Sequence, residues 1–232
     1  VTEKRCRVGG RVKVMPLEEM NSFFDARVKD YEEYVRQEAD GAQDYYRETA
    51  KLIPKRKRLS LVDLGVGTGL ELDEIFQQNP GVTVTGIDIS EGMLRKLREK
   101  NRKRMEQVQA VKGNFFEYDF GIERYDGAVS VMSMHYFEPQ AKLELYRKLG
   151  RSLKKGGFYL ETDLYAPNGE YEQSCAAENE RLRREQGIRG GFYHYRIPCT
   201  VERQAKLFFA AGFSSVRVCW ACGNTVILMA KK

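Results

Sequence analysis

Apolar residues along this chain alternate between short continuous runs and stripes at helical spacing. Residues 59–64 form a run that predicts a buried strand, and Leu70, Leu72, Ile75 and Phe76 then recur at the spacing of a helix. The same succession repeats, with strands expected at 82–88, 108–112, 126–134 and 158–164, and helices after Ser90, Pro139 and Thr200. Strands that alternate with helices predict a parallel sheet with helices on its faces.

The two ends of the chain depart from this alternation. Residues 215–230 are predicted to be two strands joined at Gly223-Asn224, a dipeptide typical of an antiparallel hairpin. Residues 1–16 have no clear period and are predicted to be a disordered arm. Residues 17–53 have a helical pattern, which predicts two helices separated at Gly41, and Pro54 ends the second of them.

The main domain is expected to span 59–232 and to contain one long insertion. Residues 165–198 are more than a simple connection between a strand and a helix needs, and they include a charged helix around 171–186. Because this segment follows a parallel strand, we expect it to cap the carboxyl ends of the strands, where open α/β sheets bind ligands.

A glycine-rich turn joins the first strand to its helix. Gly65, Gly67 and Gly69 follow G-x-G-x-G spacing, which differs from the G-x-G-x-x-G of dinucleotide-binding proteins. Asp63 lies just before this turn, where a carboxylate repels phosphate and attracts a cation. Asp88 ends the second strand and can accept hydrogen bonds from the hydroxyls of a ribose. The pattern predicts a ligand with a ribose, a positive charge and no phosphate, such as S-adenosylmethionine.

Five motifs resemble the class I S-adenosylmethionine-dependent methyltransferases. They are V-D-L-G-V-G-T-G at 62–69, G-I-D-I-S at 86–90, G-N-F-F-E-Y-D-F at 113–120, Y-D-G-A-V-S-V-M-S-M-H at 125–135 and L-K-K-G-G-F-Y-L-E-T at 153–162. The resemblance implies a Rossmann-like, seven-stranded, mostly parallel sheet with helices on both faces and an antiparallel last strand. It also implies that 17–58 is a helical lid over the cofactor, although both helices could instead simply cover the sheet, and the insertion 165–198 is expected to cap the substrate.

The resemblance assigns S-adenosylmethionine as the cofactor. The residues that it implies for cofactor binding are Tyr31, Asp63, Gly65, Val66, Gly67, Gly69, Asp88, Ile89, Met93, Asn114, Phe115 and Val131. Asn114 stands where many relatives carry an aspartate that accepts a bond from the adenine amino group, and an amide can accept that bond too. Either Phe115 or Phe116 could pack on the adenine ring, or both could belong to the core.

Methyl transfer is an in-line displacement that needs alignment of donor and acceptor, sometimes a base, and no metal. His135 and His194 are the only histidines and are the candidates for a general base, although either could instead be structural. The (D/N)-P-P-(Y/F) tetrapeptide for amide or adenine nitrogens is absent, since S-M-S-M-H occupies its place. Pro198-Cys199 lies outside the strand ends, where a cysteine nucleophile is not expected.

The distribution of charge and the cysteine content indicate which partners and which compartment to expect. The net charge of +6 arises mainly from residues 1–13 and from K-R-K-R at 55–58, a predicted tail and linker. Five scattered cysteines without a visible signal segment predict reduced thiols and a cytoplasmic protein, and no apolar run is long enough to span a membrane. C-W-A-C at 219–222 is predicted to be ordinary strand sequence.

We therefore predict methyl transfer from S-adenosylmethionine to the oxygen or nitrogen of a small molecule. An RNA methyltransferase is one alternative, motivated by the basic segments, although nucleic acid is the less favoured partner. A non-catalytic S-adenosylmethionine-binding protein of the same fold is another. The acceptor and the oligomeric state are left open by the sequence.

Overall fold

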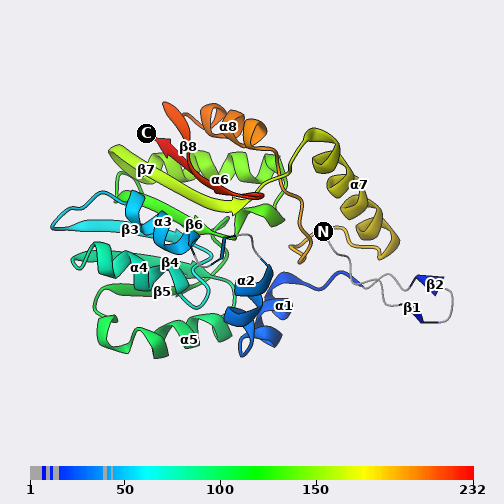
Figure 1. Ribbon diagram of the computed structural model, residues 1–232, viewed down its shortest axis with the longest axis horizontal. Coiled ribbons are helices and arrows are strands. Elements are labelled where there is room, and N and C mark those ends of the chain that lie inside the picture. Colours follow the sequence, from blue (N-terminus) through cyan, green and yellow to red (C-terminus); the bar gives the residue numbers. More distant parts are fainter. Residues whose placement is uncertain (1–6, 9–10, 13–15, 39–40, 43) are drawn as a thin grey trace.

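The computed structural model describes residues 7–8, 11–12, 16–38, 41–42 and 44–232. Their main feature is a seven-stranded sheet in the order β5-β4-β3-β6-β7-β9-β8 (Figure 1). The strands are β3 Leu59–Leu64, β4 Val82–Asp88, β5 Val108–Lys112, β6 Tyr125–Val131, β7 Leu153–Leu164, β8 Ser215–Cys222 and β9 Thr225–Lys231. β9 runs antiparallel to both of its neighbours, β7 and β8, and the other paired strands are parallel. The predicted Rossmann-like sheet and its terminal hairpin are confirmed.

Helices cover both faces of this sheet (Figure 1). α3 Tyr45–Leu52, α4 Leu70–Gln78 and α5 Glu91–Lys100 contribute buried residues to one core cluster. α6 Pro139–Ser152 and α8 Val201–Ala210 contribute to the cluster on the other face. Ser90 and Thr200 cap α5 and α8 by accepting hydrogen bonds from backbone N–H groups, as their sequence positions predict.

The N-terminal helical segment differs from the prediction in two ways. The first predicted helix is two, α1 Met20–Arg27 and α2 Tyr31–Glu38, separated by a turn in which the carbonyl of Val28 is bonded by Lys96 Nζ at 3.2 Å. α3 is part of the helical layer and not of a lid, because its Thr49 hydroxyl bonds Thr162 of β7 at 2.6 Å. Apolar spacing gives the same stripe for a lid helix and for a sheet-covering helix, so it could not separate them.

The predicted arm is only partly described, whereas the predicted cap is described in full. Within 1–16, β1 Arg7–Val8 and β2 Arg11–Val12 pair as a short antiparallel ladder, and most of the other positions lie outside the described residues. The cap contains α7 Gly169–Glu185, which extends away from the sheet (Figure 1). A chain segment after α7 returns to the body and pairs with the residues before α1.

This pairing joins residues 18–20, at the start of α1, to residues 192–194 of the cap. Met20 N–H donates to Phe192 O, and His194 N–H donates to Glu18 O, both at 2.9 Å. Glu19 and Tyr193 lie opposite each other in an antiparallel bridge between these bonds. The segment that contains α1 and α2, called the lid from here on, is therefore connected to the cap at the carboxyl edge of the sheet.

β6 ends at Val131, three residues before the predicted end, because Met132 has a left-handed backbone with φ 55°. This turn leads into the short 3₁₀ helix η2, Met134–Tyr136.

The left-handed backbone of Met132 should lower the stability of the protein. Only glycine adopts such a φ without strain, so a side chain here costs about 1 kcal/mol. We expect Met132→Gly to be more stable than Met132→Ala by about 1 kcal/mol in urea unfolding, since both variants lose the same contacts. Equal stability would mean that Met132 is unstrained.

The cysteines of the described region are unpaired thiols, and Cys6 lies outside it. C-W-A-C lies in β8 as predicted, and the described residues contain no cluster of His, Cys, Asp or Glu suited to a metal. Cys199 is buried in the core, where Lys142 Nζ lies 3.2 Å from its sulfur. No helix in the described part of the chain is long and apolar enough to cross a membrane.

Candidate functional site

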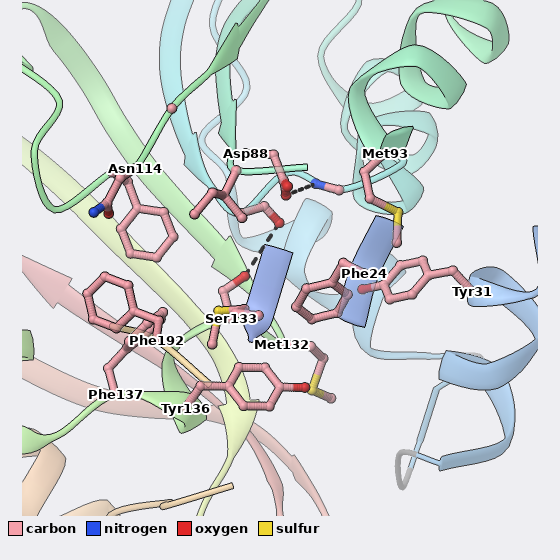
Figure 2. Close-up of a pocket in the computed structure, with 16 residues that line it drawn as sticks. Phe24, Tyr31, Asp88, Met93, Asn114, Met132, Ser133, Tyr136, Phe137 and Phe192 are labelled. Atoms are coloured by element: carbon pink, nitrogen blue, oxygen red, sulfur yellow. Dashed lines mark hydrogen bonds between the residues drawn. The ribbon is translucent and has the colours of Figure 1, made fainter. Parts of the chain in front are cut away.

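A pocket lies at the carboxyl ends of β3, β4, β5 and β6 and is closed by the lid and the cap (Figure 2). The loops that follow these adjacent strands converge there, which is the ligand-binding edge of an open parallel sheet. Of the residues predicted for cofactor binding, eight line it: Tyr31, Gly65, Gly67, Asp88, Ile89, Met93, Asn114 and Phe115.

The glycine turn forms the floor of the pocket. Gly65 and Gly67 have φ values of 77° and 51°, so both need glycine's freedom at positive φ. A Cβ on Gly65 would also overlap the hydroxyl of Ser133, which lies against the turn from the end of β6. Tyr31 of α2 covers the other side of Gly67, since a Cβ there would lie 3.8 Å from its ring. The turn is thus packed against residues from the lid and from β6.

Asp88 is the buried carboxylate of the pocket, with 9% of its surface exposed. Its Oδ2 accepts a hydrogen bond from Gly67 N–H at 2.9 Å, and its Oδ1 accepts one from Ser90 N–H at 2.8 Å. Burial nevertheless raises the pKa of Asp88 to about 6. Each oxygen keeps a further lone pair, so the group can hold two hydroxyls of a ribose in the pocket.

Asn114 and Phe115 occupy the end of the pocket that follows β5. Asn114 Oδ1 accepts from Phe116 N–H at 3.0 Å, and its Nδ2 donates to Glu117 at 2.9 Å, so the side chain shapes its own loop. Phe115 lines the pocket, whereas Phe116 lies behind it and stacks on Phe192 at 5.0 Å. The sequence left the two phenylalanines as equal candidates, and Phe115 is the one that a ligand could reach.

Asp63 lies beneath the glycine turn and forms an acidic pair with Glu71 of α4. Both oxygens of Asp63 and one of Glu71 are buried without a hydrogen-bond partner among the described residues. Burial raises the pKa of Asp63 well above its usual range, and the charge of Glu71 adds to this. Burial also raises the pKa of Glu71 to about 7. A cation near this pair would favour its charged state.

Three other predicted residues do not line the pocket. Val66 is buried against Gly86 of β4, and Gly69 is the left-handed residue before α4, packed by Leu72. Val131 is part of the core at the end of β6. They lie behind the wall of the pocket and do not face its interior.

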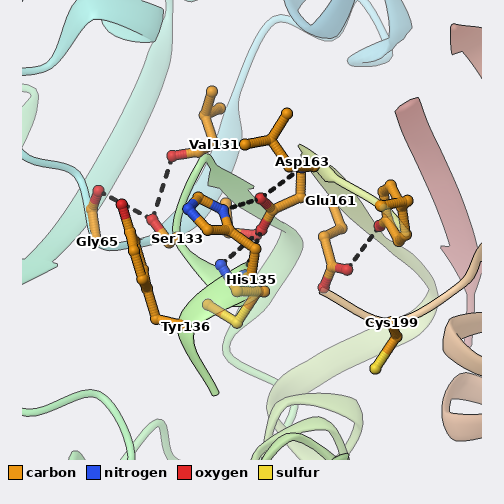
Figure 3. Close-up of polar contacts among 12 residues, drawn as sticks. Gly65, Val131, Ser133, His135, Tyr136, Glu161, Asp163 and Cys199 are labelled. Carbon is orange, nitrogen blue, oxygen red and sulfur yellow. Dashed lines mark hydrogen bonds and ion pairs between the residues drawn. The ribbon is translucent and has the colours of Figure 1, made fainter. Parts of the chain in front are cut away.

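Neither histidine lines the pocket. His135 is 3% exposed, and its Nδ1 bonds the carboxylate of Asp163, which also accepts the N–H groups of Met134 and His135 (Figure 3). The predicted place of His135 at the pocket rim is therefore corrected, because Asp163 holds the ring inside the protein. His194 lies one layer behind the wall, with its Nε2 3.2 Å from the hydroxyl of Tyr136.

Several lining residues were not predicted as site residues. They are Met20, Phe24, Gly113, Met132, Ser133, Tyr136, Phe137 and Phe192. The lining residues within 132–137 directly follow a parallel strand, and that position could have predicted them as site residues. The lining residues from the lid and the cap could not be predicted in this way, because pairing between distant segments brings them to the pocket.

Sequence comparison relates this chain to methyltransferases. The model of a family described as a methyltransferase domain matches residues 61–157. The chain is 24% identical to a carboxy-S-adenosyl-L-methionine synthase from Nautilia profundicola over 228 residues, and this alignment covers 93% of each protein.

Solved structures share the fold at low identity. A putative O-methyltransferase from Nostoc punctiforme aligns with a TM-score of 0.69 and 18% identity, over 94% of this chain and 63% of that one. A Haemonchus contortus phosphoethanolamine N-methyltransferase 2, in complex with S-adenosyl-L-methionine, aligns with a TM-score of 0.64 and 18% identity, over 86% of this chain and 44% of that one. This chain thus spans less than two thirds of the length of either.

Proposed function

This chain belongs to the class I S-adenosylmethionine-dependent methyltransferases, and we propose that it methylates an oxygen or nitrogen of a small-molecule acceptor. The observation that carries the proposal is the pocket itself. It joins a buried carboxylate, Asp88, which we propose binds the ribose, to an apolar wall from the lid, the segment after β6 and the cap. S-adenosylmethionine supplies an activated methyl group on a sulfonium.

The residues of the pocket suit this cofactor along its length. Asp88 would hold the ribose, and Asn114 and Phe115 would contact the adenine. Gly65 and Gly67 give the amino-acid tail close access to the backbone. Asp63 and Glu71, which no hydrogen bond satisfies fully, lie beneath the turn, and the ammonium of that tail would favour their charged forms.

In the transfer step, the acceptor atom attacks the methyl carbon, the carbon–sulfur bond breaks, and sulfur leaves with the electron pair. The protein's part is to orient the acceptor and exclude water, which accounts for much of the acceleration in reactions of this type. A proton leaves the acceptor oxygen or nitrogen, and the pocket wall must let it pass to a base or to solvent.

Synthesis of carboxy-S-adenosyl-L-methionine, which the name of the Nautilia profundicola relative prints, is less suited to this pocket. The additional carboxylate of that product would lie beyond the sulfur, against the apolar wall, and there it needs a cationic partner. Within the described part of the chain, the residues that line the pocket include no lysine or arginine. We therefore favour methyl transfer.

An RNA acceptor is also less suited to the geometry. K-R-K-R at 55–58 is exposed and immediately precedes β3, at the amino edge of the sheet. The pocket lies at the opposite, carboxyl edge. Phosphates bound at 55–58 would therefore hold an RNA away from the methyl group.

Calorimetry with S-adenosylhomocysteine tests the cofactor, and product formation across a panel of small-molecule acceptors tests the transfer. We expect micromolar binding of S-adenosylhomocysteine, no binding of NAD, and methylation of at least one acceptor with S-adenosylmethionine. Binding without turnover on any acceptor would favour a non-catalytic protein. RNA binding that depends steeply on salt, with methylation of that RNA, would replace the small-molecule proposal.

A further inference from the structure

Basic residues gather at the amino edge of the sheet, which is the end away from the lid helices α1 and α2 (Figure 1). Five segments that precede or begin parallel strands, or end the antiparallel β9, form this amino-edge surface: 55–58, 102–106, 119–126, 151–155 and 231–232. They hold 13 lysines and arginines against four aspartates and glutamates, a net charge of +9, whereas the whole chain has +6. The rest of the chain is therefore net acidic.

Contacts between these segments show that the charges share one surface. Arg56 and Lys154 both pair with Asp126, at 3.8 and 2.9 Å. Burial lowers the pKa of Lys231, and the charges of Arg217 and Arg56 lower it further. The cations before β3, at the start of β7 and at the end of β9 therefore lie within electrostatic range of one another. One carboxylate shared by two of them leaves an excess of positive charge.

An isoleucine is held in solvent at the same edge. Ile122 is 80% exposed and lies in the loop before β6. The next two residues fix this loop, since the N–H groups of Glu123 and Arg124 donate to the carbonyls of Arg151 and Ser152 at 3.0 and 2.7 Å. Glu123 has a left-handed backbone with φ 47°, which is strained for a residue with a side chain. The backbone thus presents Ile122 outward at a fixed position.

Charged side chains surround this isoleucine. Ile122 lines an open hollow together with three cations and one acid: Arg147, Arg151, Lys232 and Glu123. Residues 211–213 line the hollow from its other side, directly after the last turn of α8. Phe209 of that turn is 52% exposed. Two of the three exposed large apolar side chains among the described residues are therefore close to this basic hollow.

We propose that the amino-edge surface binds the face of an anionic lipid membrane, with its lysines and arginines on the headgroup phosphates and Ile122 in the interface between headgroups and acyl chains. Anionic headgroups attract clusters of lysine and arginine, and an inserted apolar side chain supplies the second contribution that stable anchoring needs. A nucleic acid would also attract the cations, but it offers bases that stack on aromatic rings and no apolar phase for an isoleucine.

This contact needs no membrane-spanning segment, and it goes beyond the proposed methyl transfer. The pocket lies at the carboxyl edge, so a membrane at the amino edge leaves it open to its ligands. Co-sedimentation of the full chain with phosphatidylcholine vesicles, prepared with and without phosphatidylglycerol, tests the proposal. We expect the vesicles that contain phosphatidylglycerol to bind at least tenfold more tightly, and added salt to weaken this binding.

Two variants test the two contributions separately. Ile122→Ser should weaken binding to the anionic vesicles by about tenfold, because it removes the inserted apolar surface and keeps the charge. Arg151→Gln combined with Lys155→Gln should weaken it by about fivefold for each residue and should reduce its dependence on salt. Both variants should bind S-adenosylhomocysteine as the wild type does, since none of these residues lines the pocket.

Matched controls change the same properties elsewhere on the protein. Val218→Ser removes an apolar side chain that is 55% exposed in the middle of β8. Arg184→Gln combined with Arg189→Gln removes two exposed charges from the cap. Both controls should bind the vesicles as the wild type does, if the amino edge carries the contact.

Tryptophan fluorescence distinguishes insertion from attraction by charge alone. The chain has one tryptophan, Trp220 of β8. In Ile122→Trp, the added tryptophan should shift its emission to shorter wavelength on anionic vesicles and be quenched by brominated acyl chains. The wild type, which reports Trp220 alone, should show neither change.

Several results would overturn the proposal. They are no binding to anionic vesicles at low salt, equal binding to vesicles without phosphatidylglycerol, and full binding by Ile122→Ser with no change in the emission of Ile122→Trp. Binding of a single-stranded RNA that depends on the basic residues and not on Ile122, without vesicle binding, would assign the surface to nucleic acid instead. Failure of the wild type to bind S-adenosylhomocysteine would overturn the proposed function and leave this inference standing.

Discussion

Replacing Asp88 with alanine is expected to weaken the binding of S-adenosylhomocysteine by about 10- to 100-fold, or ~1.5–3 kcal/mol. The carboxylate is buried between Gly67 and Ser90, and the ribose hydroxyls would bind its two oxygens. Alanine removes both acceptors, and no other carboxylate among the described residues lines the pocket. Calorimetry at pH 7.5 measures the loss directly.

Two controls separate ligand binding from damage to the fold. Asp73→Ala removes an exposed carboxylate from α4 and should leave the affinity unchanged. Asp88→Asn keeps the shape and one acceptor oxygen, so its affinity should lie between those of the wild type and Asp88→Ala. An unchanged dissociation constant in Asp88→Ala, with the protein folded, would remove Asp88 from the cofactor site.

The affinity should also depend on pH through this group. Burial raises the pKa of Asp88 to about 6, and the protonated acid is a poorer acceptor for two hydroxyls. Binding of S-adenosylhomocysteine should therefore weaken as the pH falls through about 6, and this dependence should be smaller in Asp88→Asn.

The sequence predicted the side of the pocket that local motifs define. Asp88, Gly65 and Gly67 stand at the ends of strands, and the carboxyl ends of parallel strands meet at one edge of the sheet, so strand assignment alone brings them together. The fold class followed from the same alternation of strands and helices, because its period is local.

The other side of the pocket depends on contacts far apart in the chain. Met20 reaches the pocket because its N–H pairs with the carbonyl of Phe192, more than 170 residues later. His135 was expected at the rim, but Asp163 of β7 turns its ring inward. The apolar periodicity of strands and helices carries no information about contacts between residues far apart in the chain. It could therefore predict neither the pairing of Met20 with Phe192 nor that of His135 with Asp163.

The acid pair beneath the glycine turn gives the unliganded protein an unusual stability profile. Burial raises the pKa of Glu71 from 4.5 to about 7, so the folded protein holds this proton more tightly than the unfolded chain. The resulting stabilisation is complete below pH 4.5 and is lost as the pH rises through about 7. For Glu71 the change corresponds to about 3 kcal/mol in the free energy of unfolding.

We therefore expect Glu71→Gln to be more stable than the wild type at pH 8, with the difference disappearing toward pH 4.5. Glutamine keeps the shape and cannot become charged, so its free energy of unfolding should vary less between pH 5 and 8. Urea unfolding across this range measures the effect, and Asp73→Asn, an exposed change on the same helix, is the matched control. Parallel pH profiles for the wild type and Glu71→Gln would show that Glu71 does not titrate in this range.

The same pair should respond to the ligand if it acts on the ammonium of the amino-acid tail. Lys100, whose charge lowers the pKa of Glu71, is itself paired with Glu32 at 3.0 Å, so its charge is shared between Glu32 and the acid pair. A bound ammonium favours the charged acids, and S-adenosylhomocysteine should therefore release protons on binding near pH 6.5. Calorimetry in buffers of different ionisation enthalpy counts these protons, and Glu71→Gln should release fewer. If wild type and Glu71→Gln released equal numbers of protons, the acid pair would not interact with the bound ligand.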